Sequence, residues 1–583
     1  MSATMRRLEY ACLALMLLAV LAVGVAEIHD FDTFWQLQSG RYMAETGSLI
    51  RTDLFTLAPD APRFEHCWLH DLALYGLFKL GGYSALSLWQ GVTLAGTAAA
   101  LVAAALLRGA SLPAVALTFP VFLFSAGGWV ARPQLWTFLG FALFVLLLER
   151  FRARQTRAVY GLVPIALLWA NLHAGSILAI AVLAAYLTGF GAEAGWRRHW
   201  RGSAVRFLLP AAVLAAVAAL LTPYPADWLR TLLASPQLGA ATDATGTVIV
   251  DMSAAFNMDW TPTTFQNSPL FFYALAAAVV VMLLGFRRFH PVDLCLLAGL
   301  AFMGLKLVRH TSFFYFGMVA ILPAYLDAAI VPLKERLAPG LRRWGTVALL
   351  LLACGWGWLF YQNLWRIYGP FNTGLRTWHF PVAAAEFVER EKLPRNLYNT
   401  YDWGGYLEWA LFPAGYRVFW DQRQNSPEMF RLGWEAMAGK PTWIETFARF
   451  DINTVVLRPL TIDTGQRYPL LDLLRTAPDW NLVFADDTAL VFVRTGSMPG
   501  SWLAARRIPA ERIDDTILTT ARLMTDVNPN RYLAWYEMAQ VYLRRRQLAE
   551  AKFALERYLP RTPQRDPQAE QTWQMLENMT RGQ

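Results

Sequence analysis

Long apolar runs separated by short polar stretches fill the first two thirds of the chain. By hydropathy there are about eleven, near residues 9–26, 84–107, 112–129, 134–149, 159–173, 176–191, 205–222, 268–286, 291–307, 313–332 and 346–364. Runs of this kind are typical of membrane-spanning helices, although several are short for a complete crossing. The pattern therefore predicts a polytopic α-helical membrane protein, with a transmembrane domain over residues 1–365.

The first apolar run has the charge pattern of a signal peptide, because Arg6 and Arg7 precede it. However, Val25-Ala26-Glu27 is a poor small-residue cleavage site, and many more apolar runs follow. We therefore expect this first helix to be retained in the membrane.

Basic clusters between the apolar runs predict the orientation. After Arg6 and Arg7 they lie at Arg108, at 150–157, at 197–201, at 287–288 and at 334–343. Each follows an even-numbered run, as the positive-inside rule expects if all face the cytoplasm. The N-terminus is then cytoplasmic, and an odd number of spans places the tail on the opposite, extracytoplasmic side. These clusters account for the net charge of +9, so no nucleic-acid partner is expected.

The opposite ends of the runs carry a different set of side chains. Ionisable residues gather there, namely His29, Asp30, Asp32, Arg132, His173, Asp259, Arg309 and His310. A polar cavity on the outer face explains so many ionisable groups on one side. The alternative for each residue taken alone is helix capping or anchoring at the interface, including contact of arginine with lipid phosphate.

The first outer loop, residues 27–82, has two amphipathic stretches. Residues 33–45 are predicted to form a helix on the membrane surface, with Phe34, Leu37 and Tyr42 toward lipid. Residues 69–80 are predicted to form a second one with an apolar stripe. The loop would then hold its acidic residues over the cavity.

Strands and helices alternate after the last apolar run, which predicts an extracytoplasmic α/β domain over residues 366–500. Residues 510–583 are predicted to form a helical tail. Within it, residues 532–565 fit one tetratricopeptide-like (TPR-like) repeat, with Trp535, Ala539, Tyr542, Ala551 and Pro563 at the repeat's typical positions. Helix pairs of this type dock other proteins or the neighbouring domain, so a protein partner is expected for this tail.

The loop motifs resemble those of the C-type (GT-C) class of membrane glycosyltransferases. Asp32-Thr-Phe34-Trp35 is similar to the acidic–aromatic element of oligosaccharyltransferase catalytic subunits. A broad group of uncharacterised bacterial relatives resembles the chain still more over residues 1 to about 500. Its motifs are matched at Asp30, Asp32, Trp35, Gly40, Arg41, Thr52, Asp53, Phe55, His66, Trp68 and Leu69, and further on at Trp403-Gly-Gly-Tyr406 and Asp421-x-Arg423, whereas Gln36 replaces a usual histidine.

The resemblance implies a glycosyltransferase of the bacterial inner (plasma) membrane with a periplasmic tail. It would use a polyprenyl-(di)phosphate-linked sugar donor and transfer the sugar to an envelope acceptor at the outer face of that membrane. The general base would be Asp32, with Asp30 as the second choice. Candidate groups for the donor phosphate are Arg132, His173, Arg309, His310, His70 and Asp53. Mg²⁺ or Mn²⁺ at Asp30 and Asp32 is an open alternative, because hard cations favour carboxylate oxygens.

Other interpretations remain for these residues. Asn171 could satisfy His173 at a helix end, Gly404-Gly405 could be a tight turn, and Asp421 with Arg423 could be a local ion pair. For the whole chain, the alternative is a non-catalytic membrane transporter or an assembly factor for envelope polysaccharide with a docking tail. The absence of an internal sequence repeat, and the position of the ionisable residues at the outer ends, favour the enzyme over a transporter.

Overall fold

The structure is a computed structural model that describes residues 3–58, 63, 65–198, 204–225, 261–336, 339–423 and 426–581. The predicted cavity residue Asp259 lies outside these ranges. The chain divides into two compact units. The helical unit comprises Met1–Asp30 and Phe64–Leu375, and the α/β unit comprises Phe31–Arg63 and Arg376–Gln583. Most of the first predicted loop therefore belongs to the same unit as the C-terminal segment.

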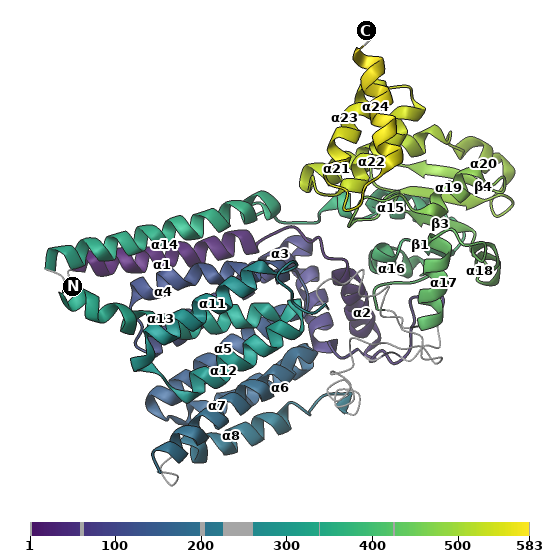
Figure 1. The fold of residues 1–583 in the computed structure, drawn as a ribbon. Coiled ribbons are helices and arrows are strands. Elements are labelled where there is room, and N and C mark those ends of the chain that lie inside the picture. The colour runs from purple at the N-terminus through teal and green to yellow at the C-terminus, as the bar shows by residue number, and fades with distance from the viewer. Residues whose placement is uncertain are drawn as a thin grey trace. The chain divides into compact units, whose positions relative to one another are not determined.

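Each predicted apolar run coincides with a helix of the helical unit (Figure 1). These are α1 (Ala3–Gly24), α3 (Trp68–Leu107), α4 (Leu112–Thr118) continued by the 3₁₀-helix η1 (Phe119–Gly128), α5 (Gln134–Arg154), α6 (Leu162–Leu172), α7 (Ile177–Trp196), α8 (Ala204–Ala218), α11 (Pro269–Leu284), α12 (Pro291–Lys306), α13 (Thr311–Arg336) and α14 (Pro339–Tyr368). Among the described residues, six helices are long and apolar enough to cross a membrane. The protein is thus a multi-pass helical membrane protein, as predicted, and the count of eleven spans stays a prediction.

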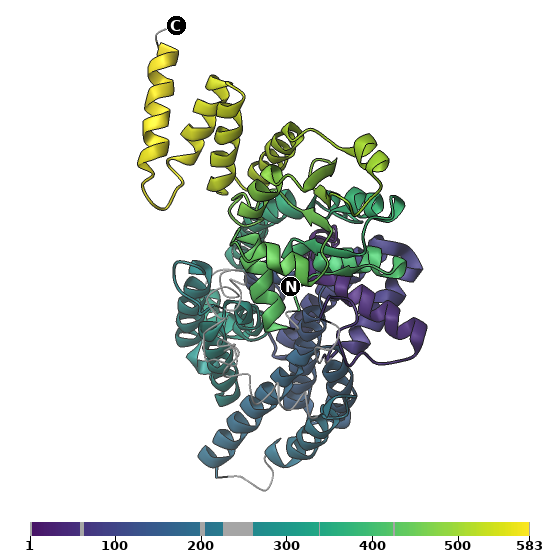
Figure 2. The ribbon, with the colours of Figure 1, turned by 90° about the vertical axis from the view of Figure 1, so that its right-hand side faces the viewer.

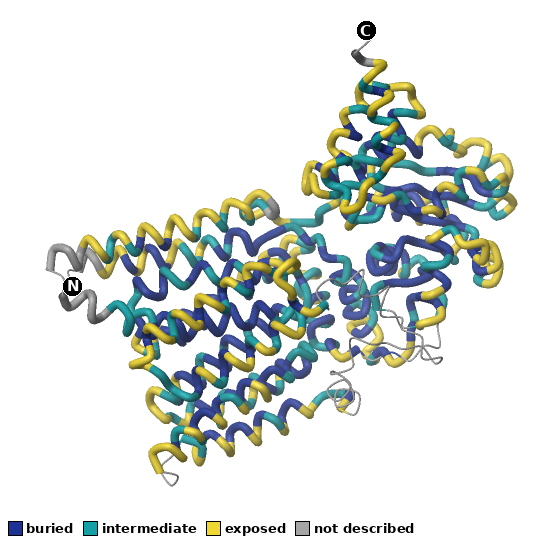
Figure 3. Tube along the Cα trace, in the orientation of Figure 1, coloured by how far each residue is buried: buried dark blue, intermediate teal, exposed yellow. Residues whose placement is uncertain are grey.

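Helix α5 lies in the core of this unit. Its side chains Phe138, Phe141 and Phe144 are fully buried, and they pack with aromatic residues of α13 and α6. By contrast, much of the apolar surface of α14 is exposed, for example at Leu351 and Trp358. Figure 3 shows the exposed parts of this helix in yellow. Apolar side chains on an outer helix are in contact with lipid when the unit lies in a bilayer.

A buried ionic network joins the helices at the end of the unit that carries Arg108. The guanidinium of Arg108 donates to Glu149 at 2.8 Å and to Asp293 at 2.6 Å, and Arg152 donates to Asp293 at 2.8 Å. Two arginines thus balance two carboxylates, which buried charges require. In the sequence analysis, Arg108 and Arg152 served only as positive charges that indicate the orientation of the chain. In the structure they form ion pairs that link α3, α5 and α12.

The α/β unit contains a five-stranded sheet in the order β2-β1-β3-β5-β4. The strands are β1 (Asn396–Asn399), β2 (Arg417–Val418), β3 (Thr454–Leu457), β4 (Trp480–Ala485) and β5 (Leu490–Arg494). The pairs β1–β2 and β1–β3 are parallel, and β3–β5 and β4–β5 are antiparallel. The helices α15 (Val382–Arg390), α16 (Gly404–Leu411), α17 (Pro427–Met437), α18 (Trp443–Arg449) and α19 (Pro469–Thr476) surround it.

Strand β2 is shorter than the strand that residues 416–421 suggest. The reason lies in Asn399, whose side chain accepts from the Phe419 amide at 3.1 Å and whose carbonyl accepts from the Trp420 indole at 2.7 Å. These contacts replace the ladder after Val418. On its other side β2 pairs with the first-loop segment, because Leu57 N donates to Val418 O at 3.0 Å and Val418 N to Phe55 O at 3.2 Å. The edge strand is therefore covered.

The helix predicted over residues 33–45 is present as α2 (Asp32–Thr46), but the predicted lipid-facing side is wrong. Phe34 and Leu37 are fully buried within the α/β unit. The ring of Phe34 packs against Phe380 at 4.5 Å and Tyr406 at 4.9 Å. The aromatic face of α2 is buried on protein, because α16 offers a close-fitting partner for it.

The second predicted surface helix is the first part of α3, which runs on to Leu107. Gly81 and Gly82 interrupt it with non-helical backbone angles, and the φ of +60° at Gly82 lies in the region that glycine favours. This kink separates the stretch Trp68–Leu80 from the apolar part of the same helix.

The tail consists of α20 (Gly500–Arg506), α21 (Glu511–Val527), α22 (Tyr532–Arg544), α23 (Leu548–Tyr558) and α24 (Pro567–Arg581) (Figure 2). Helices α22 and α23 pack on each other through the buried Ala539 and Ala551. Helix α21 is bonded to the turn between β4 and β5, because the hydroxyls of Thr516 and Thr520 donate to the carbonyls of Asp486 and Asp487. A helix pair is what a TPR-like repeat forms, and membership in that repeat family stays a prediction.

Candidate functional site

The N-terminal end of α5 organises a polar cluster in the helical unit, which we call the α5 cluster: Asp30, His70, Arg132, Trp136, Thr137 and His173. Arg132 lies just before α5, and its Nε donates to Asp30 Oδ1 at 2.6 Å. The Arg132 side chain keeps 34% of its surface exposed, whereas Asp30 keeps 9%. The guanidinium thus holds the carboxylate and still has surface available for an anion.

Two consecutive residues of α5 contact two of the predicted histidines. The Trp136 indole donates to His70 Nδ1 at 3.0 Å. The Thr137 hydroxyl lies 2.6 Å from His173 Nδ1, and the Trp169 indole donates to the same hydroxyl at 2.8 Å. Because one helix turn carries both contacts, the two histidines are held by the same rigid element.

Positive groups surround His173. Burial lowers its pKa well below the usual value, and the charges of Arg309, His66 and His70 lower it further. These surroundings favour the neutral imidazole over the charged one. The structure thus holds His70 and His173 against one helix, with the charge of Arg309 acting on His173, and an anion site there stays a prediction.

Two glycines create the space that these contacts need. A side chain at Gly175 would come within 2.6 Å of Thr137 Oγ1 and 2.7 Å of His173 Nδ1. A side chain at Gly140 would come within 2.6 Å of the Trp169 ring. All three distances are too short for a Cβ atom, so the two positions tolerate only glycine if the cluster is to keep its geometry.

A groove of about 560 Å³ lies beside the cluster in the helical unit. It is lined by Trp68, Leu69, Leu167, Leu168, Asn171, Leu221, Thr222 and Pro223. Asn171 accepts from the Trp68 indole at 3.0 Å and donates to the carbonyls of Leu167 and Leu221. Asn171 is thus used within the groove wall, and Thr137 satisfies His173 instead.

His310 lies in η7 (Val308–His310) at the start of α13, with its ring 6.4 Å from that of Phe313. Its neighbour Arg309 acts on His173 through its charge. Of this predicted pair, Arg309 is the residue that the structure links to the α5 cluster.

Asp32 and Asp53, the other two predicted site residues, belong to the α/β unit. Asp32 is the first residue of α2, where its negative charge complements the helix dipole, and Oδ1 accepts from the Trp35 indole at 3.2 Å. Asp53 is fully buried. Its Oδ1 accepts from the amides of Phe55 and Thr56, and its Oδ2 accepts from the Thr56 hydroxyl at 2.7 Å. The Asp53 carboxylate therefore holds the turn that leads into the covered edge of the sheet.

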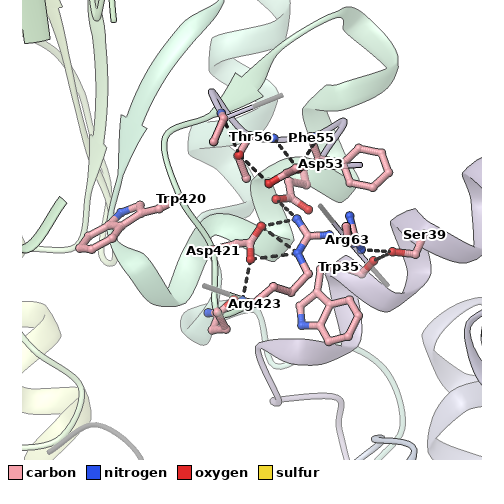
Figure 4. A network of polar contacts seen from close by, with 12 residues as sticks. Trp35, Ser39, Asp53, Phe55, Thr56, Arg63, Trp420, Asp421 and Arg423 are labelled. Atoms are coloured by element: carbon pink, nitrogen blue, oxygen red, sulfur yellow. Dashed lines mark hydrogen bonds and ion pairs between the residues drawn. The ribbon is translucent and has the colours of Figure 1, made fainter. Parts of the chain in front are cut away.

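A second polar network, the Arg423 cluster, lies in the α/β unit and comprises Asp53, Arg63, Glu408, Asp421 and Arg423 (Figure 4). Arg423 Nε donates to both carboxylate oxygens of Asp421 at 2.9 Å, and Nη2 donates to Glu408 Oε1 at 2.5 Å. The guanidinium carbon lies 5.5 Å from the ring centres of both Trp35 and Phe55. The arginine thus connects the first-loop segment with α16 and the end of β2.

The two carboxyl groups that contact Arg423, those of Glu408 and Asp421, have opposite character. Burial raises the pKa of Glu408 well above its usual value against the pull of Arg423, and the nearby Asp421 and Asp53 raise it further. For Asp421, burial is outweighed by Arg423 and by hydrogen bonds, so that its pKa is lowered. The surroundings thus favour the ionised form of Asp421 beside Arg423 and the protonated form of Glu408. The local ion pair that the sequence left open is therefore present.

Gly404 and Gly405 allow α16 to approach its neighbours. A side chain at Gly404 would meet the Trp420 carbonyl and come within 2.7 Å of the Asp421 Cα. At Gly405 it would come within 3.1 Å of Trp35 N and 3.2 Å of Phe31 O. The shared motifs at Trp35, at Gly404-Gly405 and at Asp421-x-Arg423 therefore form one packed region of the α/β unit.

The sequence analysis missed Trp136, Thr137 and Trp169, which hold the histidines. The available signal was the position of Trp136-Thr137 in the first turn of a helix, directly after Arg132-Pro133 at the expected membrane face. A polar residue in an otherwise apolar membrane helix is a candidate for a functional contact.

A divalent ion has few protein ligands available. Among the residues that the structure describes, no three His, Cys, Asp or Glu side chains gather to hold a metal. Mg²⁺ is often bound by only one or two carboxylates together with substrate phosphate, so Asp30 and Asp32 still fit such an ion by chemistry. The possible Mg²⁺ or Mn²⁺ stays a prediction, in which the substrate supplies part of the coordination.

The fold defines a class, a multi-pass helical membrane protein with an α/β unit built partly from its first loop. No protein-family model matches the chain, and no curated protein matches it. Among solved structures, the chain is similar to the arabinofuranosyltransferase AftD from Mycobacteria, with a TM-score of 0.50, 15% identity and coverage of 84% of this chain and 40% of that chain. A mutant of the same enzyme gives a TM-score of 0.49 at 15% identity, with 84% and 41% coverage.

The likeness to AftD shows the fold alone, because the identity is 15%. The two chains share a similar arrangement of helices, and the GT-C class stays a proposal. The chain spans about 40% of the length of its structural neighbour, so the activity of that larger enzyme does not transfer with the fold. The predicted relationship to one bacterial group and the tail's repeat family are not addressed by it.

Proposed function

We propose that this protein is an inner-membrane glycosyltransferase of the GT-C type, which uses a polyprenyl-phosphate- or polyprenyl-diphosphate-linked sugar and acts at the outer face of the membrane. The acceptor is an envelope molecule. The membrane fold and the likeness to an arabinofuranosyltransferase support the class of enzyme. The donor, the acceptor and the orientation are part of the proposal.

The observation that carries the proposal is the α5 cluster. It combines the partly exposed side chain of Arg132 with His70 and His173 at the ends of membrane helices, and the charge of Arg309 acts on His173. Such a set of donors and cations suits the phosphate of a lipid-linked donor, which sits at the membrane surface. The groove beside it, with leucines on two helices, offers an apolar wall for the donor's isoprenoid.

In the proposed reaction, the acceptor hydroxyl or amide forms a bond to the anomeric carbon while the bond from that carbon to the phosphate oxygen breaks. The acceptor's proton moves to the Asp32 carboxylate, and the phosphate oxygen keeps the bonding electron pair. Arg132 and Arg309 stabilise the negative charge that grows on the phosphate. Asp30, which Arg132 already engages, supports the arrangement by fixing this guanidinium.

The test is transfer of a radiolabelled sugar from a series of polyprenyl-phosphate donors by the full chain in proteoliposomes. The Asp32→Asn variant is expected to lose transfer by at least about a hundredfold, since general base catalysis contributes factors of this size. Glu45→Gln, at the exposed far end of α2, serves as the matched control and should keep full activity. Wild-type protein without transfer from any donor, and unchanged envelope glycans in cells that carry Asp32→Asn, would favour the scaffold or transporter.

A further inference from the structure

The Thr137 hydroxyl of the α5 cluster has two hydrogen-bond partners in the described part of the chain, the Trp169 indole and His173 Nδ1. An indole N–H can only donate, so the Thr137 oxygen accepts from Trp169. The hydroxyl proton then needs an acceptor, because Thr137 is only 2% exposed. The acceptor within reach is His173 Nδ1.

The two hydrogen bonds, from Trp169 to Thr137 and from Thr137 to His173, determine which ring nitrogen of His173 is protonated. If Nδ1 accepts from Thr137, the neutral imidazole must be protonated at Nε2. His70 is in the same state, because its Nδ1 accepts from the Trp136 indole at 3.0 Å. Consecutive residues of α5 thus hold both histidines with Nδ1 as acceptor and Nε2 as donor.

We propose that Thr137 and Trp169 are positioning residues that fix His173 as a neutral Nε2–H donor, and that this N–H binds a phosphate oxygen of the lipid-linked donor. Within the described residues, His173 Nε2 has no hydrogen-bond partner of its own, and His173 is half-buried. The role in transfer rests on the proposed function. The tautomer itself follows from the contacts and does not depend on that function.

The arrangement has a physical advantage over a charged histidine. Arg309 already supplies positive charge near His173, and a second cation there would be repelled. A neutral N–H adds a directed hydrogen bond without that cost. Gly140 and Gly175 contribute to the same arrangement. Gly140 leaves room for the Trp169 ring, and Gly175 leaves room for the hydrogen bond from Thr137 to His173.

The tautomer is tested by ¹⁵N NMR of the full chain in bilayers, with histidine labelled. The chain has eight histidines, and a His173→Asn sample identifies the His173 signals. Wild-type protein is expected to show His173 protonated at Nε2. Thr137→Val keeps the shape but removes the hydroxyl, so a substantial Nδ1–H population should appear, and Thr137→Ser should restore the wild-type spectrum. A wild-type Nδ1–H signal, or no change in Thr137→Val, would overturn the assignment.

The role in transfer is tested with the same variants. Thr137→Val is expected to lower kcat about tenfold with a smaller change in KM, and Thr137→Ser to recover most of it. Thr97→Val is the matched control, because Thr97 is equally buried and its hydroxyl bonds only the Thr93 carbonyl of its own helix. A changed tautomer with unchanged kcat would remove the role in transfer. Wild-type protein without transfer would overturn the proposed function and leave the NMR result standing.

Discussion

Arg132 Nε lies 2.6 Å from Asp30 Oδ1, across 102 residues of sequence, and joins the segment after α1 to the segment before α5. Asp30, which the sequence analysis named as the second candidate for the general base, therefore forms an ion pair with Arg132. Because Arg132 holds Asp30, we assign Asp30 a supporting role and keep Asp32, the first choice from the sequence, as the proposed general base.

The first prediction concerns this pair. Arg132→Gln is expected to raise the KM for a polyprenyl-phosphate donor about tenfold, because a charge-assisted contact to phosphate is lost. Asp30→Asn should have a smaller effect, since Arg132 keeps its charge. The double variant should lose less than the sum of the two, because the residues act as a unit. Initial rates over a range of donor concentrations measure this, and additive losses would contradict the coupling.

The second prediction separates Asp53 from catalysis. Asp53→Ala removes three hydrogen bonds from a fully buried carboxylate, so the α/β unit should lose about 3 kcal/mol of stability. Folded protein should keep its kcat. Thermal unfolding followed by tryptophan fluorescence gives the stability, and rates are normalised to the folded fraction. If Asp53→Ala kept a normal unfolding midpoint but lost transfer, Asp53 would act in substrate binding and not in stability.

The third prediction concerns the close approach of α16. Gly404→Ala should destabilise the α/β unit by about 3 kcal/mol, since its Cβ meets the backbone of Trp420 and Asp421, which cannot move aside. Gly405→Ala should cost less, because its nearest contact is 3.1 Å away. Gly500→Ala is the control in the same unit, as a Cβ there meets open space. Equal unfolding midpoints for Gly404→Ala and Gly500→Ala would show that α16 is not packed as described.

The fourth prediction uses the protonated carboxyl of Glu408. A raised pKa in the folded state means that its protonated form is stabilising at low pH, and that stability is lost as the pH rises above about 4.3 toward the folded value. Glu408→Gln keeps the acceptor oxygen for Arg423 without this penalty. Its unfolding midpoint should match wild type near pH 4.5 and exceed it increasingly up to pH 8.

The comparison of the two proteins at each pH isolates Glu408. Asp421 has a lowered pKa, so its contribution is lost as the pH falls, but it is present in both proteins and cancels. A difference between the two midpoints that does not grow with pH would show that Glu408 is ionised in the folded protein. The Arg423 cluster would then hold two charged carboxylates.

The helices of the membrane part were predictable because their signal is local. A run of about twenty apolar residues forms a helix in a bilayer whatever its neighbours are, since each backbone polar group is then satisfied within the segment. The alternation of strands and helices over residues 366–500 was predictable for a similar reason, because short apolar runs there are bounded by turns. The wrong prediction for α2 shows the limit of such local patterns. Amphipathicity indicates that one face of a helix is buried, but it does not indicate whether that face packs on lipid or on protein.

Part of the candidate site was also readable. Topology alone indicated that Asp30, Arg132, His173 and Arg309 lie at one membrane face, and in the structure the first two form an ion pair and the charge of Arg309 acts on His173. The engagement of Asp53 by its own turn was not readable, because an acid in a loop looks the same in sequence whether it binds a substrate or caps a turn.

The sequence by itself thus determined a membrane protein, its helical segments and the types of side chain available at one face. The tertiary structure alone decided which of those groups meet. Thr137 and His173 are 36 residues apart, Asp30 and Arg132 are 102 apart, and both contacts depend on how separate helices pack. Hydropathy is summed along a segment, whereas a hydrogen bond of 2.6 Å is set by packing between segments that no local pattern encodes.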